Sequence, residues 1–516
     1  MALFEFVLAL LLGGVGLALL APRLGVPWPT LLALAGAGLA FIPGTPEAAL
    51  DPDLALALFV APVLLDAAYD ASLRDLRENW APVGGLVLGA VVLTVLAVAA
   101  VARSLEPSLP WAAAVALGAI VAPPDAAAAA AMLRQVHLPH RVLVILEGES
   151  LLNDASALLL YRLAVGAAAG GVAAWTIPAQ AVAAGAGVAL GIVLARGYMA
   201  AIGHVQDEVA SVVLGFLGTF GVWLLADALG LSPVLTMVAY AATLARFAPE
   251  RTGARQRRAI YAVWDVAVFV LNVLAFILVG LQLRGILARL GGDIGRYAGF
   301  ALAVLAVTIA VRVVWVIGYY AGSRWKQRQP GAHTRWPMPP PSAQNAVVIS
   351  WCGMRGIVTL AAALALPNGF PQRDLIVFAA FGVVLGTLVL QGLTLRPLLS
   401  HLALPSDQRV EAEVSLARAE TAQAALNALA ASADGNRDAE ARHLLVREYR
   451  ARLEACAPPG DQAGDPTGAR ALRRIALASE RARLAALRRE QRIGDDAFHR
   501  IEEELDWAEA DADRSV

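Results

Sequence analysis

Residues 147–161 read EGESLLNDASALLLY, which places two carboxylates inside an otherwise apolar helical run. An acidic side chain at the centre of a bilayer costs roughly 2.5–3.5 kcal/mol on insertion scales, so such residues usually mark a path for ions or protons. Ser150, Asn153 and Asp154 fall at i, i+3 and i+4 and therefore share one helix face. With Glu149 beside it, this face predicts a small hydrated cavity with oxygen ligands inside a transmembrane segment.

The composition indicates a membrane protein built from helices. Of the 516 residues, 58% are apolar and only 16% are charged, whereas soluble proteins carry about 25% charged residues. The apolar runs are about 20 residues long, as bilayer-spanning helices require, and the alternating pattern of outer-membrane strands is absent. The net charge of −1 does not indicate a nucleic-acid partner, and the sequence has no P-loop for ATP. We expect an all-α polytopic membrane protein without a cofactor.

Thirteen apolar segments are candidate transmembrane helices. They cover residues 2–20, 28–43, 54–69, 82–102, 111–133, 142–168, 176–201, 208–228, 232–246, 260–283, 297–320, 343–366 and 374–400. With a cytoplasmic C-terminus, thirteen spans put the N-terminus outside, and the loops predicted inside hold fifteen Lys and Arg against five outside. This excess supports a multi-pass protein of the inner membrane in that orientation.

The chain changes character near residue 404. Residues 1–403 form the predicted transmembrane domain, whereas residues 404–516 are rich in Ala, Leu, Arg and Glu with helical periodicity. From Asp407 onward the tail carries 22 acidic residues against 17 arginines, which argues against docking on anionic lipid. We expect a helical accessory tail in the cytoplasm, and a solvated, partly disordered tail is the alternative.

A second acid lies in the fifth segment, where residues 121–126 read VAPPDA. Two prolines break the helix there, and broken helices in transporters point their polar ends into a substrate site near the midplane. Asp125 would begin the second half-helix, where a negative charge is favoured. It is either a helix cap alone or a cap that also binds a cation, because the two roles are compatible.

The twelfth segment has a matching interruption, since residues 351–359 read WCGMRGIVT with glycines flanking an arginine. The fifth and twelfth segments are seven apart, so two six-helix units with the seventh segment between them would make these breaks equivalent. An odd offset also inverts one unit relative to the other, as an inverted-repeat transporter requires. We therefore expect two inverted six-helix repeats in which these two broken helices occupy equivalent positions.

Arg355, within that interruption, is permanently charged and needs a buried carboxylate as its partner. We predict a structural ion pair between Glu149 and Arg355, which leaves Asp154 uncompensated and able to exchange a proton for a cation. Pairing of Arg355 with Asp154 is the alternative, and it would lock Asp154 in its ionised form.

Two further polar residues lie within spans. Asp66, near the end of the third segment, either contributes an oxygen ligand or is an interfacial acid close to Asp70 and Arg74. Asn272, in the tenth segment, is more often an interhelical hydrogen-bonding residue than a ligand.

The motif at residues 148–155, GESLLNDA, resembles the signature of the monovalent cation:proton antiporter-1 family, the sodium/proton exchangers. Supporting resemblances are the Pro-Pro-Asp break, residues 59–69, residues 276–283 and residues 353–356. The resemblance covers about residues 1–400 and leaves the tail uncovered.

The resemblance implies a thirteen-span fold with crossed broken helices, and usually a homodimer. It implies that Asp154 binds either the cation or a proton, that Ser150 and Asp66 join it as Na⁺ ligands, and that Glu149 and Arg355 form a buried structural pair. Asn153, in place of a second aspartate, implies electroneutral exchange. Pro124 departs from relatives that carry Thr before the Asp, so a hydroxyl ligand is lost there.

These features predict a secondary antiporter, and no enzyme, that exchanges Na⁺ for H⁺ and lies as a homodimer in the bilayer. Exchange of K⁺ or Li⁺ stays open, because ligand type alone does not distinguish these ions. An organic-anion symporter on a similar fold would need cationic or neutral ligands, whereas the buried excess here is acidic. A membrane-embedded hydrolase would use Asp125 and Asp154 as an acid pair.

Overall fold

The computed structural model describes residues 2–43, 45, 51–125, 139–170, 176–290, 294–327, 342–402, 409–431, 439–453 and 466–514. Every regular element within these ranges is a helix, which confirms the predicted all-α class. Seven of the described helices are long and apolar enough to cross a membrane, and three shorter helices are also apolar. The total number of crossings and the inverted repeats stay predictions.

The helices of the predicted membrane part are α1 (Ala2–Leu24), α2 (Trp28–Leu39), α3 (Pro52–Ala55), the π-helical turn η1 (Leu56–Val60), α4 (Ala61–Asp70), α5 (Leu73–Glu78), α6 (Trp80–Gly84), the π-helical turn η2 (Gly85–Ala90), α7 (Val91–Leu105), α8 (Trp111–Val121), α10 (His140–Gly170), α11 (Thr176–Ile202), α12 (Glu208–Ala228), α13 (Pro233–Arg251), α14 (Ala254–Arg289), α15 (Ile294–Gln327), α16 (Ala343–Trp351), α17 (Ile357–Leu364) and α18 (Arg373–His401). Each of the thirteen predicted segments falls on one or more of them.

Helix α16 and helix α17 are separated by an irregular stretch at residues 352–356, which confirms the predicted break in the twelfth segment. Helix α8 likewise ends at Val121, before the Pro-Pro pair. The backbone N–H of Asp125 donates a 2.7 Å hydrogen bond to the carbonyl of Met354, so the two interruptions meet. Residues 126–138 lie outside the described residues, and with them the predicted second half-helix capped by Asp125.

Small residues let helices α2 and α14 approach closely, as membrane helices often do. A β-carbon at Gly36 of α2 would overlap the carbonyl of Ile277 in α14, and one at Gly280 would overlap the backbone of α2. Buried apolar side chains from these two helices and from α7, α8, α10, α15, α16, α17 and α18 form the main core.

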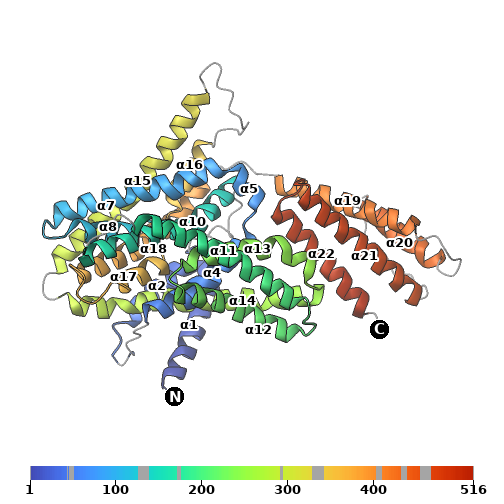
Figure 1. Ribbon diagram of the computed structural model, residues 1–516, viewed down its shortest axis with the longest axis horizontal. Helices are drawn as coiled ribbons and strands as arrows, with labels where there is room; N and C mark the ends of the chain where they lie inside the picture. Colours follow the sequence, from blue (N-terminus) through green and yellow to red (C-terminus); the bar gives the residue numbers. More distant parts are fainter. Residues whose placement is uncertain are drawn as a thin grey trace.

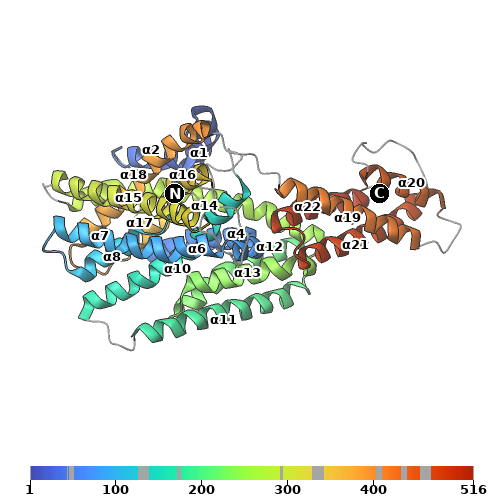
Figure 2. The same cartoon turned by 90° about the horizontal axis from the view of Figure 1, so that it is seen from above.

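The C-terminal helices are α19 (Arg409–Ala431), α20 (Ala439–Leu453), α21 (Pro466–Arg489) and α22 (Asp495–Arg514). They pack on one another around two apolar clusters of their own. Figures 1 and 2 both place this group at one end of the long axis of the molecule, beyond α12, α13 and α14. Residues 403–408 lie outside the described part, so the predicted boundary between residues 1–403 and 404–516 stays a prediction.

Candidate functional site

Glu149 in α10 is buried and forms an ion pair with Arg312 of α15. Their side chains are 1% and 3% exposed. The pair is bidentate, because both terminal nitrogens of Arg312 donate to the carboxylate, Nη2 to Oε2 at 2.8 Å. Arg312 also donates to the carbonyl of Ile349, from Nε at 3.2 Å and from Nη2 at 3.0 Å. This fork geometry stabilises two charges that would be costly to bury alone.

The predicted pairing of Glu149 with Arg355 is therefore wrong. Arg355 donates from Nε to the carbonyl of Val121 at 3.0 Å, from Nη2 to that of Ala122 at 3.2 Å, and from Nη1 to that of Gly353. These carbonyls lie where the two helices are broken and lack partners within a helix. Each of the three guanidinium nitrogens donates to one of these carbonyls, so Arg355 joins the two breaks.

The sequence contained a signal for Arg312 that our prediction missed. Arg312 lies inside the apolar segment 297–320, where a permanent charge needs a buried partner as much as Arg355 does. The glycines on either side of Arg355 drew attention to that residue, although neighbouring glycines do not identify the partner of a carboxylate.

A small cavity beside α10 brings together several of the predicted site residues. Its volume is about 30 Å³, and its polar lining consists of Asp125, Ser150, Asp154 and Asn272, with apolar side chains elsewhere. A cavity must offer roughly 10–15 Å³ to hold one water. The space therefore fits one or two waters, or one cation that has lost most of its hydration shell.

Asp154 is 7% exposed, so its side chain is buried within the protein and does not project into lipid. Among the residues that the structure describes, it forms no ion pair, because Arg312 binds Glu149 and Arg355 binds backbone carbonyls. The alternative pairing of Arg355 with Asp154 is thereby excluded. A buried carboxylate that no cation neutralises can hold either a proton or a metal cation.

Two predicted ligands do not line the small cavity. Asn153 donates from Nδ2 to Oε1 of Glu149 at 3.1 Å, and thus helps to hold the structural ion pair. Asp66 lines a different, larger cavity, although its neighbours Val63 and Ala67 line the small one. The predicted grouping of Asp66 with Asp154 and Ser150 as Na⁺ ligands therefore stays a prediction.

Asn272 of α14 is a polar lining residue that our sequence analysis treated as a packing residue. It lines the small cavity together with Asp154. Its side-chain amide offers a neutral oxygen, which a dehydrated cation accepts as a ligand. In the sequence, the only signal that Asn272 lines the cavity is its location deep within an apolar segment.

Two helix interruptions that meet, and a buried, acidic, ion-sized cavity beside them, define the class of an ion-transporting membrane protein. The described helices and the site agree with a comparison across known families. The chain belongs to the family of sodium/hydrogen exchangers, because the model of that family's transmembrane region matches residues 7–401.

Relatives and solved structures agree with this assignment. An Na⁺/H⁺ exchanger of Mycobacterium tuberculosis is 32% identical over 79% of this chain and 76% of its own. The Na⁺/H⁺ exchanger YjcE of Escherichia coli is 29% identical and covers 94% of both chains. The sodium/proton antiporter NhaP1 of Methanocaldococcus jannaschii shares the fold, with a TM-score of 0.61, 21% identity, and coverage of 78% of this chain and 98% of its own.

Proposed function

We propose that this protein exchanges Na⁺ for H⁺ at Asp154, which binds either a proton or the cation but not both. The observation that carries the proposal is a buried carboxylate, without an ion pair among the described residues, in a cavity of about 30 Å³. Because the two ions compete for one carboxylate, their movements are coupled. One Na⁺ then crosses the membrane in one direction for each H⁺ that crosses in the other. Electroneutral exchange follows from that one-for-one competition.

Ser150 and Asn272 supply neutral oxygens to the cation, and Asp125 supplies a second carboxylate from the broken fifth segment. Na⁺ is a hard cation and prefers such oxygen ligands, as Ca²⁺ and Mg²⁺ do. The Glu149–Arg312 pair and the clamp made by Arg355 hold the surrounding helices without taking part in exchange.

Exchange of K⁺ or Li⁺ is the second candidate. A relative from Bacillus pumilus, 28% identical over 93% of this chain and 73% of its own, carries the name sodium, potassium, lithium and rubidium/H⁺ antiporter. An organic-anion symporter is disfavoured, since the cavity is small and its charged lining is acidic. A hydrolase is also disfavoured, because a cavity of about 30 Å³ cannot hold a substrate between Asp125 and Asp154.

We infer a homodimer in the inner membrane with the N-terminus outside and the C-terminus in the cytoplasm. Support for the orientation comes from the loops that contact the C-terminal helices. These loops are the arginine-rich ones around Arg74, Arg141 and Arg257, which the positive-inside rule assigns to the cytoplasm.

Vesicles reconstituted with the full chain test the proposal under separate Na⁺, Li⁺ and K⁺ gradients. Each effective cation drives proton movement in the opposite direction, and a dye for membrane potential reports no charge movement. The Asp154→Asn variant, whose amide cannot exchange a proton, loses all cation-dependent proton flux. Retained flux in a correctly folded Asp154→Asn protein would refute the assignment.

A further inference from the structure

The small ion cavity is lined by two sets of helices that differ in charge. The break at Asp125, helix α10 and helix α17 supply both carboxylates and the hydroxyl of Ser150. The turn η1 and the helices α4 and α14, which we call the neutral set, supply uncharged side chains. Among the described lining residues of the neutral set, Asn272 is the one with a polar side chain. An oxygen ligand from this set therefore comes from Asn272.

The side-chain amide of Asn272 is not engaged by the protein. It forms no hydrogen bond with another residue in the part of the chain that the structure describes. The interhelical bond that ordinarily explains an asparagine in a membrane helix is therefore not made here. A buried amide is costly without a hydrogen-bond partner. Since Asn272 faces the cavity, a water or a cation in the cavity supplies that partner.

The neutral set is braced, which fixes the position of Asn272. Phe276, one turn further along α14, also lines the cavity, and its ring packs edge-on against Trp28 of α2 with centroids 5.8 Å apart. The hydroxyls of Tyr69 and Tyr261 lie 2.8 Å apart and join α4 to α14. Together with the backbone contact between α2 and α14, these contacts oppose widening of the cavity around a larger ion.

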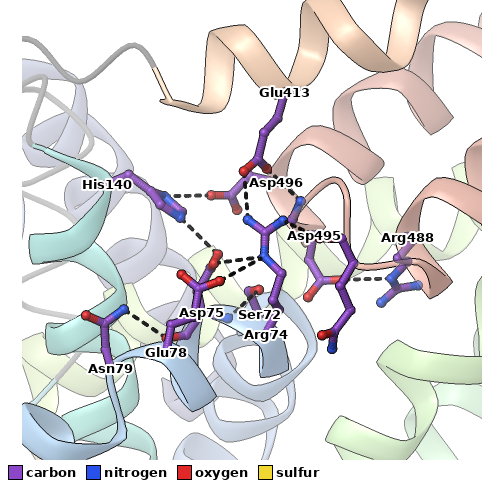
Figure 3. A network of polar contacts seen from close by, with 12 residues as sticks. Ser72, Arg74, Asp75, Glu78, Asn79, His140, Glu413, Arg488, Asp495 and Asp496 are labelled. Atoms are coloured by element: carbon purple, nitrogen blue, oxygen red, sulfur yellow. Dashed lines mark hydrogen bonds and ion pairs between the residues drawn. The ribbon is translucent and has the colours of Figure 1, made fainter. Parts of the chain in front are cut away.

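Carboxylates at the junction with the C-terminal helices already have cationic partners. Figure 3 shows Arg74 between Asp75 and Glu413, with Nη2 of Arg74 2.7 Å from Glu413. It also shows His140, whose ring nitrogens lie 3.0 Å from Asp75 and 3.1 Å from Asp496. These acids join α5 and α10 to the C-terminal helices and do not compete with the small cavity for an alkali cation.

We propose that Asn272 is the ligand that makes the site prefer a small cation, Na⁺ or Li⁺, over K⁺. The proposal rests on the proposed antiport function, because it names the cation-selecting residue of that same site. The carboxylates attract every monovalent cation, since Coulomb attraction depends on charge and distance. Discrimination by size depends instead on the size of the cavity, the number of ligands and their rigidity. Asn272 adds one neutral oxygen at a fixed position.

The smaller cations lose most when this oxygen is removed. Na⁺ and Li⁺ hold their hydration shells more strongly than K⁺ does, as Mg²⁺ dehydrates more reluctantly than Ca²⁺. The cavity of about 30 Å³ has no room for a full hydration shell, so protein oxygens replace the lost waters. Loss of one oxygen therefore weakens the binding of Na⁺ more than that of K⁺.

The Asn272→Leu variant removes the amide oxygen and keeps the size and branched shape of the side chain. It places an apolar residue in an apolar segment, so the protein should still fold. In vesicles with the full chain at one pH, we expect KM for Na⁺ and Li⁺ to rise about tenfold. KM for K⁺ should rise far less, and the maximal rates should stay near those of the wild type. A change confined to KM identifies lost binding.

Val63→Ala is the matched control, because Val63 of α4 lines the same cavity without an oxygen ligand. This variant enlarges the space and keeps every ligand, so its KM for Na⁺ should stay near the wild-type value. The proposal is overturned by an unchanged KM for Na⁺ in Asn272→Leu or by an equal rise for all cations. An equal rise of KM for Na⁺ in the two variants overturns it as well, because the effect would then come from shape.

The melting temperature of the purified protein in detergent measures cation binding without transport, because a cation that binds the folded state raises it. At equal ionic strength, Na⁺ should raise the wild-type melting temperature more than K⁺ does. Asn272→Leu should lose most of this difference, and Val63→Ala should keep it. Equal protection by Na⁺ and K⁺ in the wild type overturns the proposal. The expected pattern in a wild type that exchanges no ions contradicts only the antiport function.

Discussion

At the scale of single residues, the site depends on how two buried arginines are engaged. Arg312 neutralises Glu149, and Arg355 binds the carbonyls of Val121, Ala122 and Gly353. Neither cation is left for Asp154, which shares its cavity with Asp125, Ser150 and Asn272. The membrane part thus buries two permanent cations and leaves Asp154 without an ion pair among the described residues, as the proposed exchange requires.

Glu149→Gln should mainly destabilise the fold, because it leaves Arg312 buried without its counter-charge. Removing one partner of a buried ion pair costs about 3–5 kcal/mol. We expect a clear fall in the melting temperature of the purified protein in detergent. The double variant Glu149→Gln with Arg312→Gln should recover much of the loss, because no unpaired charge remains. Near-normal stability of Glu149→Gln with lost transport would instead indicate that Glu149 handles the ion directly.

Gly356→Ala should slow exchange, because a β-carbon at this position would overlap the carboxylate of Asp125. The backbone conformation itself does not require glycine, since φ is −140°. Displacement of Asp125 should therefore appear as weaker Na⁺ dependence of exchange in vesicles, with the protein still folded. Gly318→Ala is the control, since a β-carbon there meets no atom within 4 Å. Equal exchange by the two variants would show that the position of Asp125 is unimportant.

The sequence predicted the burial of Glu149, Asp154 and Arg355, but not how they are paired. Hydropathy locates a charge within the membrane, whereas a pairing depends on which helices become neighbours in space. Arg312 and Glu149 are 163 residues apart, and no local pattern connects them. The cavity that Asp66 lines was unpredictable for the same reason, since it depends on how α4 is rotated against α10 and α14.

At the scale of secondary-structure elements, the arrangement rests on two interrupted helices and on one close helix pair. The interruptions meet through the hydrogen bond from Asp125 to the Met354 carbonyl and through Arg355. Proline and glycine marked both interruptions in the sequence, so their existence was predictable. Their contact was expected from the family resemblance, which implies crossed broken helices. The close contact of α2 with α14 was not predicted, because glycines are frequent throughout the chain.

Gly36→Ala should separate α2 from α14 and destabilise the membrane part. Its β-carbon would overlap the carbonyl of Ile277, and backbone cannot move as easily as the end of a side chain. Overpacking of this kind typically costs about 1–3 kcal/mol. Gly38→Ala, two residues along the same helix, meets no atom within 4 Å and should leave the melting temperature unchanged. Equal melting temperatures for the two variants would contradict the close contact.

At the scale of the whole molecule, the C-terminal helices extend the chain beyond the solved relative, whose match covers 78% of this chain. The matched YjcE chain, in contrast, is covered over 94% of both lengths. The helical nature of the tail was predictable from its Ala and Leu periodicity. Its contacts with α5, α10 and α14 were not, because the acidic residues that dock are indistinguishable in the sequence from solvated ones.

Arg257→Gln should release the C-terminal helices more completely than changes to exposed ion pairs do. It leaves Asp506, which is 2% exposed, with Arg481 as its remaining ion-pair partner among the described contacts. Arg418→Gln removes an exposed pair with Glu504, and such pairs contribute about 0–1 kcal/mol. Hydrogen exchange of the α22 amides should rise in the first variant and stay unchanged in the second. Faster exchange in Arg418→Gln than in Arg257→Gln would show that the buried ion pair does not hold the C-terminal helices against α14.

The most direct test of the central claim is the proton released when Na⁺ binds to the purified, detergent-solubilised protein. Titration with Na⁺ in a weakly buffered solution with a pH indicator should release up to one proton per chain, with apparent affinity that falls as pH is lowered. Asp154→Asn should release none while keeping the wild-type melting temperature. Proton release by Asp154→Asn equal to that of the wild type, or Na⁺ binding without proton release in the wild type, would contradict exchange at this carboxylate.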